Sequence, residues 1–151
     1  MAEKENKETF ELRDSHGTVY LTFTADKEND LYVAKWHNHI TAKEVYTAGE
    51  KYLELMAKQP YSSLVNDKSE VSGDWQEAND WLEYEWFPKA KKAGLKHFAY
   101  IFSTEMYSYM SGQDLYKRLK EKVDFDICTS LEKAMDWLKE IALKAKNKTT
   151  S

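Results

Sequence analysis

The segment LVNDKSEVSGDWQEANDWLEYEWF, residues 64–87, decides the fold of this chain. Its apolar start predicts a strand, an acidic turn containing serine follows, and a helix rich in aromatic residues begins near Asp74. Strand–turn–helix units are the building blocks of α/β sheets. Because such sheets place ligand sites and switches outside the carboxyl ends of their strands, we expect the working surface of the protein at this junction.

The residues before this segment predict three antiparallel strands and a helix. The strands are Thr9–Asp14, Thr18–Ala25 and a third near Leu31–Trp36. The second strand alternates apolar with polar residues, as a sheet with one wetter face requires. A capping box opens the helix at Thr41, and the helix stops before Pro60.

The remainder of the chain alternates strands with helices. Strands are predicted over Ser62–Asn66, His97–Phe102 and Phe125–Cys128, and helices over residues 74–92, around 113–122 and from a capping box at Thr129 onward. The fold class is therefore α/β, with a mixed sheet of about five to six strands and about four helices. We expect one domain at residues 9–143, between polar tails at residues 1–8 and 144–151.

The charge and the cysteine content argue against several classes of protein. The formal net charge is -4 and only Arg13 and Arg118 are arginine, so the chain lacks the basic face of a nucleic-acid-binding protein. No apolar run approaches the ~20 residues that span a bilayer, and the charged start does not have the pattern of a secretory signal. The single cysteine, Cys128, cannot form an internal disulfide. We expect a cytoplasmic protein with no nucleic-acid partner and no membrane span.

The helix predicted at residues 74–92 has more aromatic residues than one buried face needs. At about 100° per residue, its core face consists of Trp75, Ala78, Leu82, Trp86 and Ala90. The flank or the opposite side then holds Trp81, Tyr84 and Phe87. These three either pack beneath neighbouring loops or form an exposed aromatic surface for a protein partner or a second copy of the chain.

A second aromatic stretch, residues 104–110, follows the buried strand His97–Phe102. Its Met106, Tyr107 and Tyr109 either cap the core or line an adaptable apolar pocket against the helix at residues 74–92. Such a pocket would take an apolar small molecule or a lipid.

Catalytic and metal-binding motifs are weak in this chain. Carboxylates crowd residues 67–85, but the spacing from Asp67 fails the calcium-loop pattern, so they indicate a solvated face or a patch for a basic partner. His37 and His39 would supply only two ligands of a zinc site. Cys128 has no adjacent base that would activate it. With no nucleophile elbow, Walker loop or dinucleotide fingerprint either, we expect no cofactor, no metal site and no enzyme activity.

The order of elements and several short motifs resemble the STAS-like, SpoIIAA-like domains, which are relatives of bacterial anti-sigma-factor antagonists. The motifs are Leu64-Val65-Asn66-Asp67, Ser69, Gly73-Asp74-Trp75, Glu77-Ala78 and Ala134-Met135-Asp136-Trp137-Leu138. The resemblance covers Phe10 to Ile141, and it is closer to the uncharacterised SpoIIAA-like proteins than to the sporulation regulators.

In the regulators, a serine at the start of the helix after this strand is phosphorylated, which switches binding to a partner kinase. The resemblance implies Ser72, or else Ser69, as the phosphoacceptor. The setting differs, since the regulators have Asp-Ser-(Ser/Thr)-Gly where this chain has Glu70-Val71 before Ser72. A helix N-terminus favours an added phosphate, whereas the neighbouring carboxylates repel it.

The resemblance and the aromatic helix together imply a non-enzymatic regulatory or scaffolding domain. It would act through protein contacts at residues 67–87, either as a homodimer or with a different protein. The alternative is a module that binds an apolar small molecule or a lipid between residues 74–92 and 104–110.

Overall fold

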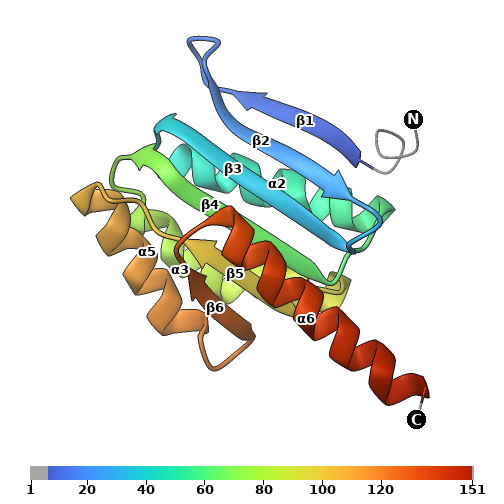
Figure 1. The fold of residues 1–151 in the computed structure, drawn as a ribbon. Coiled ribbons are helices and arrows are strands. Elements are labelled where there is room, and N and C mark those ends of the chain that lie inside the picture. Colours follow the sequence, from blue (N-terminus) through green and yellow to red (C-terminus); the bar gives the residue numbers. More distant parts are fainter. Residues whose placement is uncertain (1–6, 151) are drawn as a thin grey trace.

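The computed structural model describes residues 7–150, so most of the predicted tail at residues 1–8 lies outside the described residues. Six strands form one sheet in the order β1-β2-β3-β4-β5-β6, which is also their order along the chain (Figure 1). The first three strands pair antiparallel, and β3 to β6 pair parallel. The predicted α/β fold with a mixed sheet is confirmed.

Most elements have boundaries close to the predicted ones. The strands are β1 Lys7–Arg13, β2 Val19–Asp26, β3 Leu31–His39, β4 Ser63–Ser72, β5 His97–Ile101 and β6 Asp124–Cys128. The long helices are α2 Ala42–Lys58, α5 Met106–Leu119 and α6 Leu131–Thr150. The fourth helix is a composite of a 3-10 turn η1 Gln76–Ala78, α3 Asn79–Trp81, a π-turn η2 Leu82–Trp86 and α4 Phe87–Ala93.

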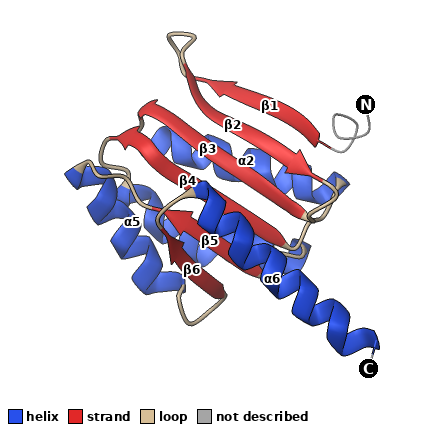
Figure 2. Ribbon diagram, in the orientation of Figure 1, coloured by secondary structure: helices blue, strands red, loops and turns tan. Residues whose placement is uncertain are grey.

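The sheet separates two helical layers of unequal size. In Figure 2, α6 crosses the near face over β4, β5 and β6, while the other helices lie behind the sheet. The larger hydrophobic cluster fills the space between the sheet and α2, the composite helix and α5. A smaller cluster, which includes Val65, Ala99 and Leu138, lies beneath α6. Alternate residues of β4 therefore face two different cores.

The core face predicted for the composite helix is confirmed. Its members Trp75, Ala78, Leu82, Trp86 and Ala90 are all buried. The helix is not a regular α-helix, because the five residues of the π-turn widen it in the middle. A π-turn carries an inserted residue and is frequent at functional sites. Residues beyond the π-turn therefore do not keep the angular positions of a regular helix.

The acidic segment at residues 67–72 belongs to strand β4, whereas the sequence analysis predicts a turn there. β4 extends to Ser72 because β3 also extends, and the two strands remain paired as far as His39 and Ser72. Interstrand pairing satisfies the backbone groups of this segment, which outweighs the turn preference of its serine and acidic residues.

Two further boundaries differ from the predictions. Residues 106–110 form the first turns of α5, because the Glu105 side chain caps the backbone N–H groups of Tyr107 and Ser108. The last helix is capped by Ser130, whose Oγ accepts from the N–H of Lys133, one residue later than the predicted capping box at Thr129. The helix then continues to Thr150, so residues 144–150 are helical and not an extended tail.

Candidate functional site

The carboxyl ends of β3 and β4 meet the start of α5 at one edge of the sheet. His39 and Ser72 are register partners in the two parallel strands, and His39 Nδ1 lies 3.1 Å from Ser72 Oγ. With Glu105 and Tyr107 they line a shallow depression on the surface. The structure thus places Ser72, the phosphoacceptor that the resemblance implies, beside His39, which the sequence analysis considers as a zinc ligand.

Glu105 joins the end of β4 to the start of α5. Its carboxylate accepts hydrogen bonds from the N–H of Gly73 at 2.7 Å, of Tyr107 at 2.7 Å and of Ser108 at 3.3 Å. These backbone hydrogen bonds, first that of Gly73, lower the pKa of Glu105. The helix N-terminus, which attracts anions, is therefore already occupied by a carboxylate.

Gly73 is required at this junction. Its φ of +112° is unfavourable for residues with a side chain, and an added Cβ would lie 2.0 Å from the carbonyl oxygen of Ile40. The close approach brings the start of the composite helix against the connection between β3 and α2. Because the backbone is fixed here, Ser72 and Glu105 are held in place.

The two serines considered as phosphoacceptors have different surroundings. Ser72 is half-buried and lies beside His39, whereas Ser69 is exposed and donates its hydroxyl to Asp67 Oδ1 at 2.7 Å. A phosphate on Ser72 would meet the Glu105 carboxylate across the same depression. A phosphate on Ser69 would lie next to buried Asp67. Both settings oppose an added negative charge, and neither decides whether it is added.

The three aromatic residues considered for one exposed surface, Trp81, Tyr84 and Phe87, differ in their exposure to solvent. Tyr84 is 67% exposed, as expected, with Lys122 Nζ 5.6 Å from its ring centroid. Phe87 is buried, and Trp81 packs edge-on against Tyr46 with ring centroids 5.2 Å apart. Trp81 also covers Gly49, so close that an added Cβ there would lie 2.7 Å from the indole. Phe87 therefore belongs to the core, and Trp81, which is half-buried, packs the composite helix against α2.

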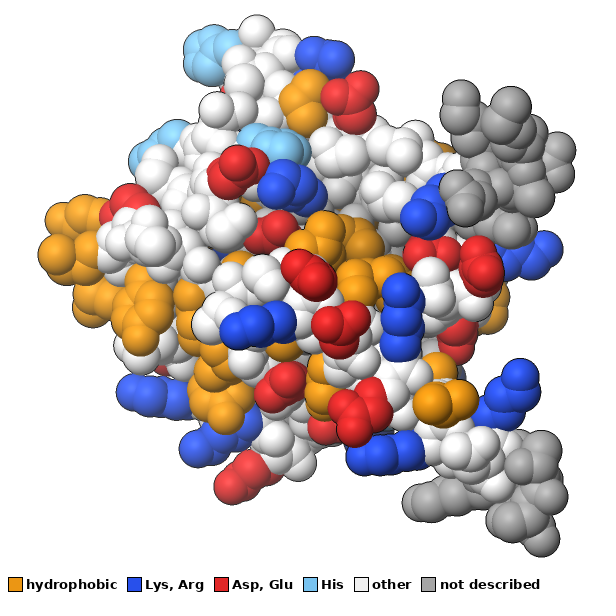
Figure 3. Space-filling model, in the orientation of Figure 1, with side chains coloured by type: hydrophobic (Ala, Val, Ile, Leu, Met, Phe, Trp, Pro, Cys, Tyr) orange, Lys and Arg blue, Asp and Glu red, His pale blue; other side chains and the backbone are white. Residues whose placement is uncertain are grey.

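The exposed apolar residues gather instead on the first turns of α5. We call this patch the α5 surface; it consists of Met106, Tyr107, Tyr109 and Met110, which are 66%, 61%, 40% and 53% exposed. Figure 3 shows hydrophobic side chains over this helix at the left of the molecule. Tyr107 also lines the depression at His39 and Ser72, so the α5 surface and the strand ends form one continuous region.

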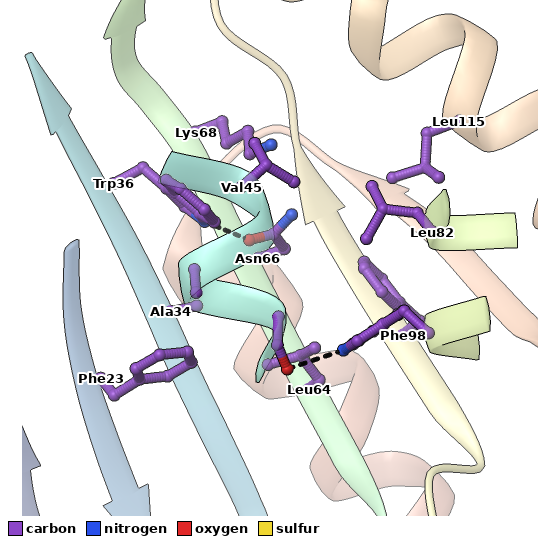
Figure 4. Close-up of a pocket in the computed structure, with 13 residues that line it drawn as sticks. Phe23, Ala34, Trp36, Val45, Leu64, Asn66, Lys68, Leu82, Phe98 and Leu115 are labelled. Atoms are coloured by element: carbon purple, nitrogen blue, oxygen red, sulfur yellow. Dashed lines mark hydrogen bonds between the residues drawn. The ribbon is translucent and has the colours of Figure 1, made fainter. Parts of the chain in front are cut away.

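A small cavity lies at a different place from the predicted pocket. Because Met106, Tyr107 and Tyr109 are exposed, they do not enclose a pocket against the composite helix. A cavity of about 50 Å³ lies instead between the sheet, α2 and the π-turn (Figure 4). Leu64, Asn66 and Lys68 reach it from β4, and Val45, Leu82 and Leu115 reach it from the helices.

Lys68 is buried, although it stands within the acidic segment that the sequence analysis interprets as a solvated face or a patch for a basic partner. It is 1% exposed and lies inside the larger core. Its Nζ lies 3.2 Å from the ring centroid of Trp75 and 4.5 Å from that of Trp36. The alternation of Leu64, Asn66 and Lys68 would have indicated an inward side chain, had the strand been extended that far.

Burial lowers the pKa of Lys68 well below its ordinary value. Attraction of an ammonium group to an indole face contributes about 2 kcal/mol when the pair is desolvated. This offsets only part of the several kcal/mol that removing an ammonium ion from water costs. Folding therefore favours the uncharged amine of Lys68 over its ammonium form.

The remaining candidates show no reactive arrangement. His37 lies 3.7 Å from Glu70, and within residues 7–150 no group of three histidine, cysteine or acidic side chains is placed to hold a metal ion. Cys128 is buried, and burial followed by the nearby Asp126 carboxylate raises the pKa of its thiol to about 11. Cys128 is therefore a thiol and not a nucleophilic thiolate at neutral pH.

Comparisons with known proteins add no assignment. No family model matches the chain, and no curated protein matches it. The described part of the chain also contains no helix with the length and apolar character needed to cross a bilayer. The α/β fold is shown by the structure, while the resemblance to STAS-like domains rests on the sequence motifs and on the order of elements.

Proposed function

We propose that this protein is a non-enzymatic, STAS-like regulatory or scaffolding domain of the cytoplasm that acts by binding another protein. The observation that supports this most directly is the α5 surface. Four large apolar side chains within five consecutive residues are each at least 40% exposed, although the same fold buries eight tryptophan and tyrosine side chains in its described part. Contiguous exposed apolar side chains of this kind are typical of protein contacts, in which tyrosine and methionine are enriched.

The charge next to the α5 surface favours a basic partner. Asp74 lines the same depression as Tyr107, and it accepts a hydrogen bond from Ser111 of α5. Glu77 follows on the same exposed edge of the composite helix, whereas Asp80 beside it is already paired with Arg118. A partner segment with an apolar side chain flanked by lysine or arginine would complement both the apolar and the acidic part of this surface.

An array of peptides tests this proposal. Each peptide has a central apolar residue, and its flanks carry either basic or acidic residues. We expect the protein to select basic flanks, and Tyr107→Ser to weaken binding by about 5- to 30-fold, as substitution of a contact residue worth about 1–2 kcal/mol does. Tyr84→Ser is the matched control, because Tyr84 is similarly exposed but lies beside Lys122, beyond the end of α5 opposite to the α5 surface. Equal losses in the two variants, or no preference for basic flanks, would contradict the proposal.

A homodimer is distinguished by sedimentation of the same variants. If the partner is a second copy of the chain, the wild type sediments as a dimer at micromolar concentration and Tyr107→Ser as a monomer, while Tyr84→Ser remains dimeric. If all three sediment as monomers, the partner is a different protein.

The binding of a small apolar molecule is a second candidate function, which the cavity between the sheet, α2 and the π-turn supports. Its volume of about 50 Å³ is well below the ~150 Å³ of a cavity that binds benzene. A lipid chain does not fit this volume, so the ligand would have only a few heavy atoms.

A further inference from the structure

The amine of Lys68 is isolated inside the protein. Within residues 7–150, no hydrogen bond or ion pair reaches its Nζ, which lies over the rings of Trp75 and Trp36. The nearest acidic residue along the chain, Asp67, has its carboxylate 3.6 Å from Lys35 on the other face of the sheet. A buried lysine normally has a counter-ion or hydrogen-bond acceptors, and this one has neither.

A local irregularity of the sheet lies at Lys68. Lys35 pairs with Asp67 and His37 pairs with Glu70, so β4 has two residues where β3 has one. The additional residue forms a bulge at Lys68 and Ser69. Lys68 points inward by the same alternation as Leu64 and Asn66. Because of the bulge, Asp67 and Glu70 both lie on the side of Lys35. Bulges are common beside functional sites.

The amine borders space that a small molecule can occupy. Lys68 lines the cavity of about 50 Å³, together with Asn66 and a set of buried apolar side chains. At roughly 10–15 Å³ for each water-sized occupant, this volume holds about three to five heavy atoms. Two lining residues, Leu82 and Trp86, belong to the π-turn, the irregular part of the wall.

We propose that Lys68 is a covalent binding site for a small aldehyde or ketone. The uncharged amine adds through its lone pair to the carbonyl carbon and forms a carbinolamine. The carbinolamine loses its oxygen as one molecule of water, and a carbon–nitrogen double bond remains between Lys68 and the ligand. Addition of water reverses the step, so no oxidant or reductant is consumed. Buried lysines that have lost their charge are the amines that form such Schiff bases in proteins.

Reductive trapping tests the proposal on the full chain. The protein is incubated at pH 7 with acetaldehyde and cyanoborohydride, and the rate of ethylation of each lysine is measured by peptide mapping. An ordinary surface lysine has a pKa near 10.4, so only about 0.04% of it is uncharged at this pH. We expect Lys68 to be ethylated at least about tenfold faster than exposed Lys96, even though the reagent must enter the core.

Two variants make the outcome specific. Lys68→Met removes the amine but keeps an unbranched apolar side chain, and the other lysines should then react at their wild-type rates. Leu115→Ala enlarges the cavity, so it should speed the reaction of Lys68 with butanal more than the reaction with acetaldehyde. Far-UV circular dichroism of Lys68→Met and Leu115→Ala serves as the control that both variants are folded.

Two results would contradict the proposal. If Lys68 is ethylated no faster than Lys96, or only after the chain is unfolded in urea, it is a structural lysine held by cation–π contacts and the proposal is wrong. Equal acceleration of both aldehydes in Leu115→Ala would indicate general opening of the core, which would also overturn the assigned site.

Discussion

Replacement of Lys68 by methionine should stabilise the protein, and the gain should depend on pH. Methionine keeps a flexible apolar side chain at the position and does not need to lose a proton on folding. At pH 7 the unfolded chain carries a protonated Lys68 with its ordinary pKa of 10.5, whereas burial in the folded protein lowers that pKa and opposes the bound proton. The resulting cost at pH 7 cannot exceed that of removing the proton, which is about 1.36 kcal/mol for each pH unit below 10.5, or about 5 kcal/mol. Lys68→Met should therefore raise the free energy of unfolding by up to about 5 kcal/mol at pH 7.

The sign of the pH dependence follows from the number of bound protons. The pKa of Lys68 is lowered in the folded state, so between that pKa and 10.5 the unfolded chain binds one more proton than the folded protein. The stability of the wild type therefore rises with pH in this window. The stability of Lys68→Met lacks this contribution. The advantage of the variant should shrink between pH 7 and pH 9, by at most about 2.7 kcal/mol.

Urea unfolding at pH 7, 8 and 9 measures this difference. Each midpoint, multiplied by the slope of the transition, gives the free energy of unfolding, and other titrating groups cancel between the wild type and the variant. Lys96→Met is the matched control, because Lys96 is exposed and its replacement should produce no difference that changes with pH. A constant difference between the wild type and Lys68→Met would refute the reasoning, because it would mean that the ammonium remains charged between the two indoles.

Three further predictions concern the junction and its helix. Gly73→Ala should destabilise the fold by more than about 2 kcal/mol in urea unfolding, because the new Cβ meets the carbonyl oxygen of Ile40 at a positive φ; wild-type stability would contradict the backbone geometry. Trp81→Ser should lower the free energy of unfolding by about 2–4 kcal/mol, because the packing of Trp81 on α2 is lost, whereas Tyr84→Ser should change it by less than about 0.5 kcal/mol. Equal effects of the two substitutions would show that Trp81 is not packed. Glu105→Gln should remove the stabilising contribution of the Glu105 carboxylate, which is present above the ordinary carboxyl pKa and is lost as the pH falls through the lowered pKa of Glu105. The free energies of unfolding of the wild type and of Glu105→Gln, measured against pH, should therefore converge in acid. Parallel curves would contradict the role of Glu105 as a helix cap.

The fold was predictable because its signals are local. Period-two alternation around Phe23, the capping box at Thr41 and the apolar run of β5 each predict an element without knowledge of its neighbours. The chain order of these elements then restricts the topology to antiparallel strands followed by parallel ones. The buried stripe of the composite helix was predictable for the same reason, since it begins at Trp75, before the π-turn.

The candidate site was less predictable because its signals are not local. Lys68 faces the core because β3 and β4 stay paired beyond the predicted end of the strand, and no property of the segment itself shows this. Trp81 and Phe87 are covered because α2 packs across the composite helix and the π-turn changes the direction of its faces. The start of α5 depends on the Glu105 side chain, whose carboxylate lies in a position that sequence spacing did not identify as a cap.

Site-specific cross-linking in the native host tests the central claim, a protein contact at the α5 surface, most directly. A photoreactive phenylalanine derivative replaces Tyr107 in one strain and Tyr84 in another, and both side chains are exposed in the structure. Irradiation should join the chain to one defined protein through position 107 and not through position 84. If the two positions give the same products, or position 107 gives none, the α5 surface is not the contact that this protein uses.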